Sequence, residues 1–87
     1  MKIKSKLAEN LSLPKEITLD LPILTATGTD ELHVENYKSL LAFADTCIRI
    51  RTRVGVLMVE GEKLILKQIT TENILIKGKI TATRWEG

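Results

Sequence analysis

The chain has 87 residues, which is enough for one hydrophobic core and too short for two. Hydrophobic residues make up 44% of it and charged residues 28%, a balance that excludes a largely disordered chain. The formal net charge is only +2, and the aromatic residues are Tyr37, Phe43 and Trp85. Neither a strong electrostatic footprint for duplex DNA nor a base-stacking surface follows from these numbers, so we expect one domain without a nucleic-acid partner.

Cysteine content and the N-terminal residues bear on the compartment. Cys47 is the only cysteine, so neither an intramolecular disulfide nor a cluster of thiolate metal ligands can form. The lysines at positions 2, 4 and 6 are not followed by the unbroken apolar stretch of a secretion signal. No segment approaches the roughly 20 apolar residues of a membrane-spanning helix. We therefore expect a cytoplasmic protein without a metal or cofactor.

The first residues predict a short amphipathic helix. Ile3, Leu7 and Leu11 recur at four-residue spacing, which places them on one helical face before a proline ends the helix. A helix this short is marginal in water unless it docks on the domain or on a partner. We expect an N-terminal helical arm over residues 1–13 and a folded domain over residues 14–87.

From residue 17 the apolar period changes from helical to alternating, which is typical of strands. The expected strands cover residues 17–21, 23–27, 32–35, 39–44, 46–52, 56–59, 64–69 and 74–85. Residues 39–44 are an unbroken apolar run, which favours a buried strand. Gly28 and Gly61 mark expected turns, and Gly55 marks a break.

This spacing predicts an all-β fold, namely a small antiparallel β-sandwich of immunoglobulin-like size that follows the short N-terminal helix. One pattern favours a different architecture. Residues 59–62 and residues 76–79 share an apolar, charged, glycine, charged order. The two segments start seventeen residues apart, and this interval could be the length of one rung of a β-solenoid. A short β-solenoid therefore stays open as the alternative fold.

Two ordered sets of residues resemble a known family. The first is the segment 13–22, LPKEITLDLP, followed by Thr25, Gly28, Leu32 and the segment 34–38, VENYK. The second is Ile48, Arg49, Ile50, Thr52, Gly55, Leu57, Val59, Gly61 and Leu64, then Glu72, Ile74, Ile76, Gly78 and Ile80. Together they are similar to the YabP/YqfC family of bacterial sporulation proteins, from about residue 13 to residue 81. Ser39 departs from the pattern, since many relatives have glycine there.

The resemblance implies a protein of an endospore-forming bacterium that acts in the mother cell. Relatives look like a β-sandwich domain, are needed for normal sporulation and have no assigned enzymatic activity, so the family brings no catalytic residues. We therefore expect a non-enzymatic interaction module for spore envelope assembly, peripheral to the forespore membrane, with a sporulation membrane protein as partner. The alternative is a homo-oligomeric, self-assembling scaffold of the spore envelope.

His33 and Cys47 are the candidates for chemistry. His33 is expected on the polar face of its strand beside Glu35, and a metal site would need further ligands that one chain cannot supply. Cys47 shares a strand face with Arg49, but a half-buried small side chain is the favoured interpretation. Because neither residue has a visible activating partner, a small hydrolase or redox protein is the least favoured function. We expect no catalytic site and no small-molecule substrate.

The most promising binding residues are Arg49, Arg51 and Arg53, which are expected to project from one face of a single strand. Guanidinium groups bind carboxylates and phosphates through paired hydrogen bonds, so this stripe could hold an acidic partner or anionic lipid head groups. The competing interpretation is a solvated face paired with glutamates on neighbouring strands. Residues 56–59 and 64–66 are apolar on both faces, so either they are central strands or they pair with another copy, and the second alternative makes self-association a further expectation.

Overall fold

The computed structural model describes residues 19–86. The strands in this part of the chain are β1 (Ile23–Thr27), β2 (Glu31–Glu35), β3 (Tyr37–Ala44), β4 (Cys47–Thr52), β5 (Gly55–Ile69) and β6 (Asn73–Glu86). Residues 19–86 contain no helix, and so none that is long and apolar enough to cross a bilayer. The predicted helical arm over residues 1–13 lies outside the described residues. The predicted strand 17–21 is wrong where it can be seen, because Leu19 and Asp20 form a turn.

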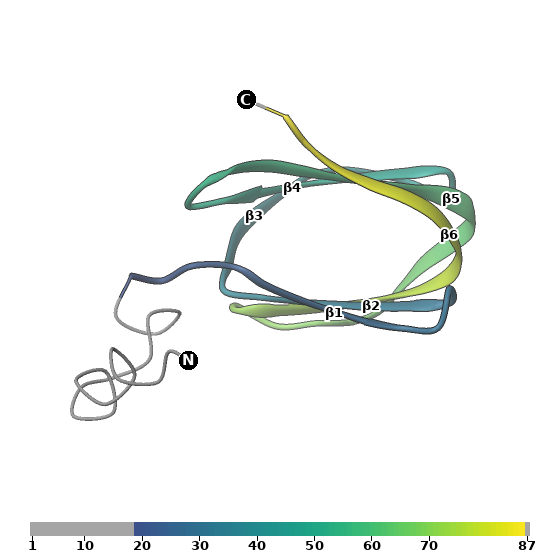
Figure 1. Ribbon diagram of the computed structural model, residues 1–87, viewed down its shortest axis with the longest axis horizontal. Coiled ribbons are helices and arrows are strands. Elements are labelled where there is room, and N and C mark those ends of the chain that lie inside the picture. The colour runs from purple at the N-terminus through teal and green to yellow at the C-terminus, as the bar shows by residue number, and fades with distance from the viewer. Residues whose placement is uncertain (1–18, 87) are drawn as a thin grey trace, which may run out of the picture.

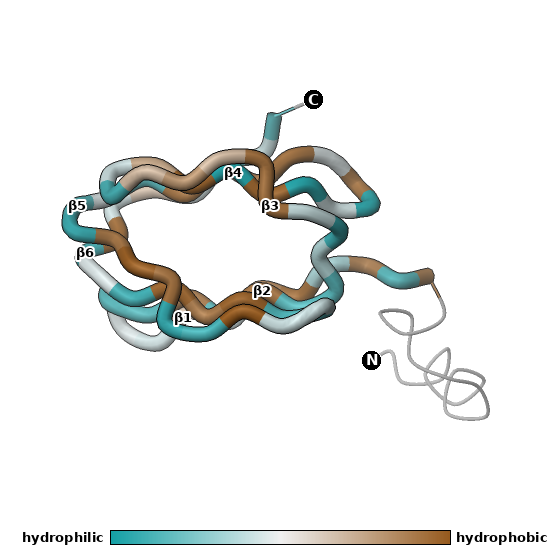
Figure 2. Tube along the Cα trace, turned by 180° about the vertical axis from the view of Figure 1, so that it is seen from behind, coloured by the Kyte–Doolittle hydropathy of each residue, from teal (hydrophilic) through white to brown (hydrophobic). Residues whose placement is uncertain are grey.

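Alternation of apolar and polar residues explains the strands near the middle of the chain. In β4, Ile48 and Ile50 are fully buried, while Arg49 and Arg51 between them lie on the other face. Successive side chains of a strand point to opposite faces, so a two-residue period buries one face and leaves the other in water. Figure 2 shows the same alternation as brown and teal segments along the strands.

All six strands join one sheet in the order β1-β2-β6-β5-β4-β3. Each neighbouring pair is antiparallel. The predicted antiparallel all-β fold is therefore confirmed, whereas the finer prediction of a β-sandwich is not, because the strands are hydrogen-bonded into one continuous sheet. The β-solenoid alternative is wrong, since the strands of neighbouring solenoid rungs run parallel.

The sheet folds over on itself because β5 and β6 bend together. The first part of β6 pairs with β2 and with the last part of β5, and its second part pairs with the first part of β5. Register shifts in the β5–β6 ladder, after Glu60 and after Glu62, lie at the bend. Figure 1 shows the result, in which β1 and β2 face β3 and β4 across the interior.

Two glycines permit this bend. A Cβ atom on Gly61 would overlap the carbonyl oxygen of Lys79, and one on Gly78 would lie 2.6 Å from the carbonyl oxygen of Lys63. Gly78 also has a φ of +137°, which favours glycine. The predicted turn at Gly61 is wrong, since β5 continues through it. The two similar four-residue segments are neighbours at one corner of the sheet, which explains their shared pattern without a solenoid.

The core lies between the two facing halves of the sheet. Its buried apolar side chains are Leu32, Val34, Ile48, Ile50, Leu57, Val59, Leu64, Ile74 and Ile76. Each such side chain stabilises the fold by roughly 1.5–3 kcal/mol relative to an exposed position. Because these residues come from β2, β4, β5 and β6, the core holds strands together that are far apart in the chain.

β3 is a strand, as predicted, but it is not buried. It occupies one end of the sheet and pairs with β4 alone among the described strands. Leu41 is 38% exposed and Phe43 is 49% exposed. The apolar composition of residues 39–44 favoured burial, but a strand at the end of a sheet lacks a neighbour on one side, and its side chains stay partly in water.

Candidate protein-binding surface

The predicted arginine stripe lies on the outer face of β4 and at its end. Ile48, Ile50 and Thr52 point into the core, so Arg49 and Arg51 project outward from the strand. Arg53 lies beyond β4, in the turn that leads to β5. The structure thus places two of the three guanidinium groups on one strand face and the third just past its end, contrary to the prediction that a single strand carries all three.

Thr52 builds the turn that holds Arg53. Its side chain is only 5% exposed. The hydroxyl donates a hydrogen bond to the carbonyl oxygen of Gly55 at 2.9 Å and accepts one from the amide of Val54 at 3.2 Å. Because one hydroxyl satisfies two backbone groups, β4 is followed by a tight turn that keeps Arg53 close to the strand end.

Arg49 is already engaged within the protein. Its Nε and Nη2 atoms donate to Oε1 of Glu86 on β6, at 3.2 and 2.8 Å. A second ion pair joins Arg84 to Glu60 on the same outer face, with an Nη2 to Oε1 distance of 2.8 Å. Arg49 thus pairs with a glutamate, as the competing interpretation of the stripe anticipated, but the glutamate lies on β6, beyond β5, and not on a neighbouring strand.

Arg51 and Arg53 are exposed, and no ion pair between residues 19–86 involves either of them. Arg51 lies opposite Ser39 of β3. The β3 residues opposite the outward-facing residues of β4 are all small, namely Ser39, Ala42 and Ala44. No bulky β3 side chain lies opposite Arg51, and Arg53 is exposed beyond the end of β4, so both guanidinium groups can form paired hydrogen bonds with a carboxylate or phosphate.

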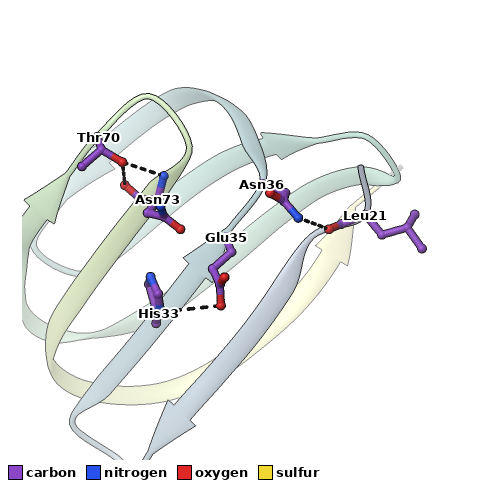
Figure 3. A network of polar contacts seen from close by, with 6 residues as sticks. All are labelled: Leu21, His33, Glu35, Asn36, Thr70 and Asn73. Carbon is purple, nitrogen blue, oxygen red and sulfur yellow. Dashed lines mark hydrogen bonds and ion pairs between the residues drawn. The ribbon is translucent and has the colours of Figure 1, made fainter. Parts of the chain in front are cut away.

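His33 and Cys47 lie on opposite outer faces of the folded sheet. His33 alternates with buried neighbours in β2, and its Nδ1 is 3.8 Å from Oε2 of Glu35 (Figure 3). Cys47 is half-buried at the start of β4, in the facing half of the sheet. The core separates them, so they cannot act as a Cys–His pair within one molecule. No three His, Cys, Asp or Glu side chains gather as a metal site within residues 19–86.

The other polar contacts hold connections between strands. Asn36 has a φ of +64° and ends β2, as predicted, and its Nδ2 donates to the carbonyl oxygen of Leu21 at 2.8 Å (Figure 3). In the β5–β6 turn, Oγ1 of Thr70 accepts a hydrogen bond from the amide of Asn73 at 3.0 Å. These contacts fix the chain path next to β1 and β3, and they converge on no cleft.

A groove of about 290 Å³ lies between the β1–β2 hairpin and the second half of β6, beyond the residues of β6 that pair with β2. Leu24 and Ile80 contribute apolar surface to it. Glu31 is the one ionisable group among its described lining residues, and its carboxylate is 3.1 Å from Nζ of Lys77. A single carboxylate that is already paired gives the groove apolar contacts, not an acid–base pair.

The two ends of the sheet differ in charge. Residues 19–36, which hold β1 and β2, contain four carboxylates and no lysine or arginine. Residues 37–54, which hold β3 and β4, contain four cationic side chains and one carboxylate. With His33 neutral, the net charges are −4 and +3, each larger in magnitude than the +2 of the whole chain. Counting charge for each hairpin reveals this segregation, which the overall net charge hides.

Comparison with known proteins places the chain in a family. The sequence profile of the YabP family matches residues 22–87, which include all six strands. "Uncharacterized protein YqfC" of Bacillus subtilis strain 168 is 30% identical over 84 residues, which is 97% of this chain and 90% of the relative. No solved structure matches. The resemblance expected from the ordered residues is confirmed, and the chain belongs to the YabP family.

Proposed function

We propose that this protein is a non-enzymatic interaction module for spore envelope assembly in the mother cell. It binds a protein partner through the outer face of β4 and the turn that follows. The resemblance to sporulation proteins supports the process, and the accessible arginines support the surface. The proposal treats the folded sheet as a small β-sandwich that presents this face, with a membrane protein at the forespore as the partner.

One observation carries the proposed surface: Arg51, opposite the small Ser39 of β3, and Arg53, in the turn after β4, are both exposed and have no ion-pair partner in residues 19–86. A guanidinium group that is unpaired in the free protein loses no internal contact when it binds a carboxylate. Arg49 differs, because Glu86 holds it at 2.8 Å. Recognition therefore falls mainly to Arg51 and Arg53, while Arg49 contributes to the shape and charge of the face.

The surface can be tested in a spore former by replacing the native gene with variants. Arg49, Arg51 and Arg53 are changed together to alanine, and a matched control changes Lys67 and Lys79, two exposed cationic residues outside this surface. We expect the arginine variant to lower the count of heat-resistant spores to that of a gene deletion and to delocalise the protein, while the control behaves as wild type. Normal localisation and sporulation of the arginine variant would rule out this surface.

Capture of the tagged protein at the engulfment stage identifies the class of partner. A membrane protein recovered with the wild type and lost with the arginine variant supports the proposal. Equal binding of wild type and variant to vesicles with anionic lipids, without a protein partner, contradicts it.

His33→Ala and Cys47→Ser should both sporulate normally, because a non-enzymatic module does not need either side chain. Loss of sporulation in a folded His33→Ala or Cys47→Ser protein would revive the catalytic hypothesis.

A further inference from the structure

We propose that copies of this protein join head to tail, with β1 of one copy adding to β3 of the next. β1 and β3 are the two ends of the six-stranded sheet. Within residues 19–86, each of them pairs with a single neighbouring strand. Each therefore has a row of backbone N–H and C=O groups on its other side, which strand addition can satisfy.

The charges that remain at the two ends are opposite. Ion pairs within the described chain neutralise part of each end: Lys38 with Asp20, Lys77 with Glu31, and Arg49 with Glu86. Among residues 19–86, no lysine or arginine pairs with Asp30 or Glu35 at the β1–β2 end, and Nδ1 of His33 is 3.8 Å from Oε2 of Glu35. Arg51, Arg53 and the carboxylate of Asp45 remain at the β3–β4 end, a net charge of +1 against −2 at the other end. Unlike ends attract each other and like ends repel, which selects the pairing of β1 with β3.

The side chains of β1 and β3 would allow the two edge strands of neighbouring copies to approach closely enough to pair. β1 has Thr25 opposite His33 and Thr27 opposite Glu31, and these threonines share the outer face with their partners. β3 has small residues at the corresponding positions and exposes Leu41 and Phe43, which an added strand would partly cover. β1 is five residues long and β3 is eight, so β1 fits within the length of β3. Covering apolar side chains adds a favourable term that salt does not screen.

Charge also argues against the other occupants of the β3 edge. Pairing β3 with β3 of a second copy would bring two hairpins of charge +3 together. Residues 1–18 contain four lysines and two glutamates, so they too are cationic. The joint of β1 with β3 uses two different patches, and each added copy leaves one of each free. Such heterologous contacts repeat from copy to copy and build rings or open chains.

The attraction between the ends is long-ranged. The charges lie mainly on β2 and β4, which would be separated across the joint by three strand spacings, about 14 Å. That distance exceeds the Debye length of about 10 Å at 0.1 M salt, so the attraction is already largely screened there and should promote association mainly at lower salt. The self-assembling scaffold that the sequence leaves open as an alternative would thus be a salt-sensitive, weakly cohesive chain of subunits.

Light scattering after size exclusion tests this on the full chain, over rising concentration, at about 50 mM and about 1 M salt. We expect the mean mass to rise past that of a dimer at low salt and to fall toward that of the monomer at high salt. A monomer at every concentration overturns the proposal. So does a mass that stops at the dimer, or oligomers that salt does not affect.

Mixing two charge variants tests the pairing itself. Arg51→Glu with Arg53→Glu changes the charge of the β3–β4 end from +3 to −1, and Asp30→Lys with Glu35→Lys changes that of the β1–β2 end from −4 to 0, so in either variant the two ends no longer carry opposite charge. Each double variant alone should associate at least about tenfold more weakly than wild type, and an equimolar mixture should recover association, because unlike ends meet again. Absence of recovery in a mixture of variants that melt like wild type overturns the proposal.

Hydrogen exchange on the wild type needs no variant. Backbone amides of β1 and β3 should exchange more slowly as concentration rises, while those at the β5–β6 corner should not change. If β1 and β3 exchange at the same rate at all concentrations, the strands do not pair between copies. The inference shares Arg51 and Arg53 with the proposed partner surface, but Asp30→Lys with Glu35→Lys leaves both arginines in place. This variant should therefore weaken self-association and still capture the partner, which separates the two proposals.

Discussion

The β5–β6 pair in the middle of the sheet and the β3–β4 pair at its end are built from similar aliphatic residues, but they differ in surroundings. β5 and β6 have a strand on each side and bend around the core. β3 has one neighbour, and Leu41 and Phe43 are partly exposed. An apolar sequence therefore predicts a strand at both places, while the number of neighbouring strands decides whether it is buried.

Truncating one aliphatic side chain in each region should give the largest contrast. Ile76→Ala in β6 removes a side chain with no exposed surface and should lower the free energy of unfolding by about 2–5 kcal/mol. Leu41→Ala in β3 removes a side chain that is already in contact with water and should cost less than about 1 kcal/mol. Urea unfolding measures both, and equal losses would show that β3 is covered in solution.

Adding a methyl group to Gly61, where β5 and β6 bend, should have the next largest effect on the free energy of unfolding. Gly61→Ala forces a Cβ atom into the carbonyl oxygen of Lys79 and should cost about 2–3 kcal/mol. Gly28→Ala is the matched control in the β1–β2 turn, where φ is +60° but the nearest side-chain atom is 3.4 Å away, so only a backbone cost of about 1 kcal/mol is expected. Similar losses in both variants, measured by urea unfolding, would refute the corner packing.

The smallest expected effect is the difference in stability between alanine variants of Arg49 and of Arg51, the two arginines of β4. Arg49→Ala removes the ion pair with Glu86, which is partly exposed, and should lower stability by no more than about 1 kcal/mol at low salt. Arg51→Ala should leave stability almost unchanged, because no ion pair in residues 19–86 involves it. Thermal melts at low and high salt measure the difference. A larger loss for Arg51→Ala would reveal a partner for it in the folded chain.

The local pattern of apolar and polar residues predicted strand bounds well where the alternation is regular. It predicted them poorly where contacts with other strands determine the chain path. β2 and β4 lie within a residue or so of the predicted strands, because one face of each is buried. The expected strand over residues 17–21 is wrong within the described part, where Asp20 has a φ of +58° in a turn. The turn expected at Gly61 is a bend inside β5, because glycine permits both and only the neighbouring strand distinguishes them.

The candidate site follows the same division. That Arg49 and Arg51 share a strand face was predictable from a two-residue period, and the ordered residues alone indicated the family. Which arginine is free was not predictable, because Glu86 comes 37 residues after Arg49 and meets it only when β6 is in place beyond β5.

Residue order thus accounts for the strands, the inward and outward faces and the YabP membership, since these depend on short-range periodicity and on residues in fixed succession. The folded sheet decides which strands become its ends, where it bends and which charges are neutralised. These depend on contacts between segments far apart in the chain, whose energies no local pattern contains.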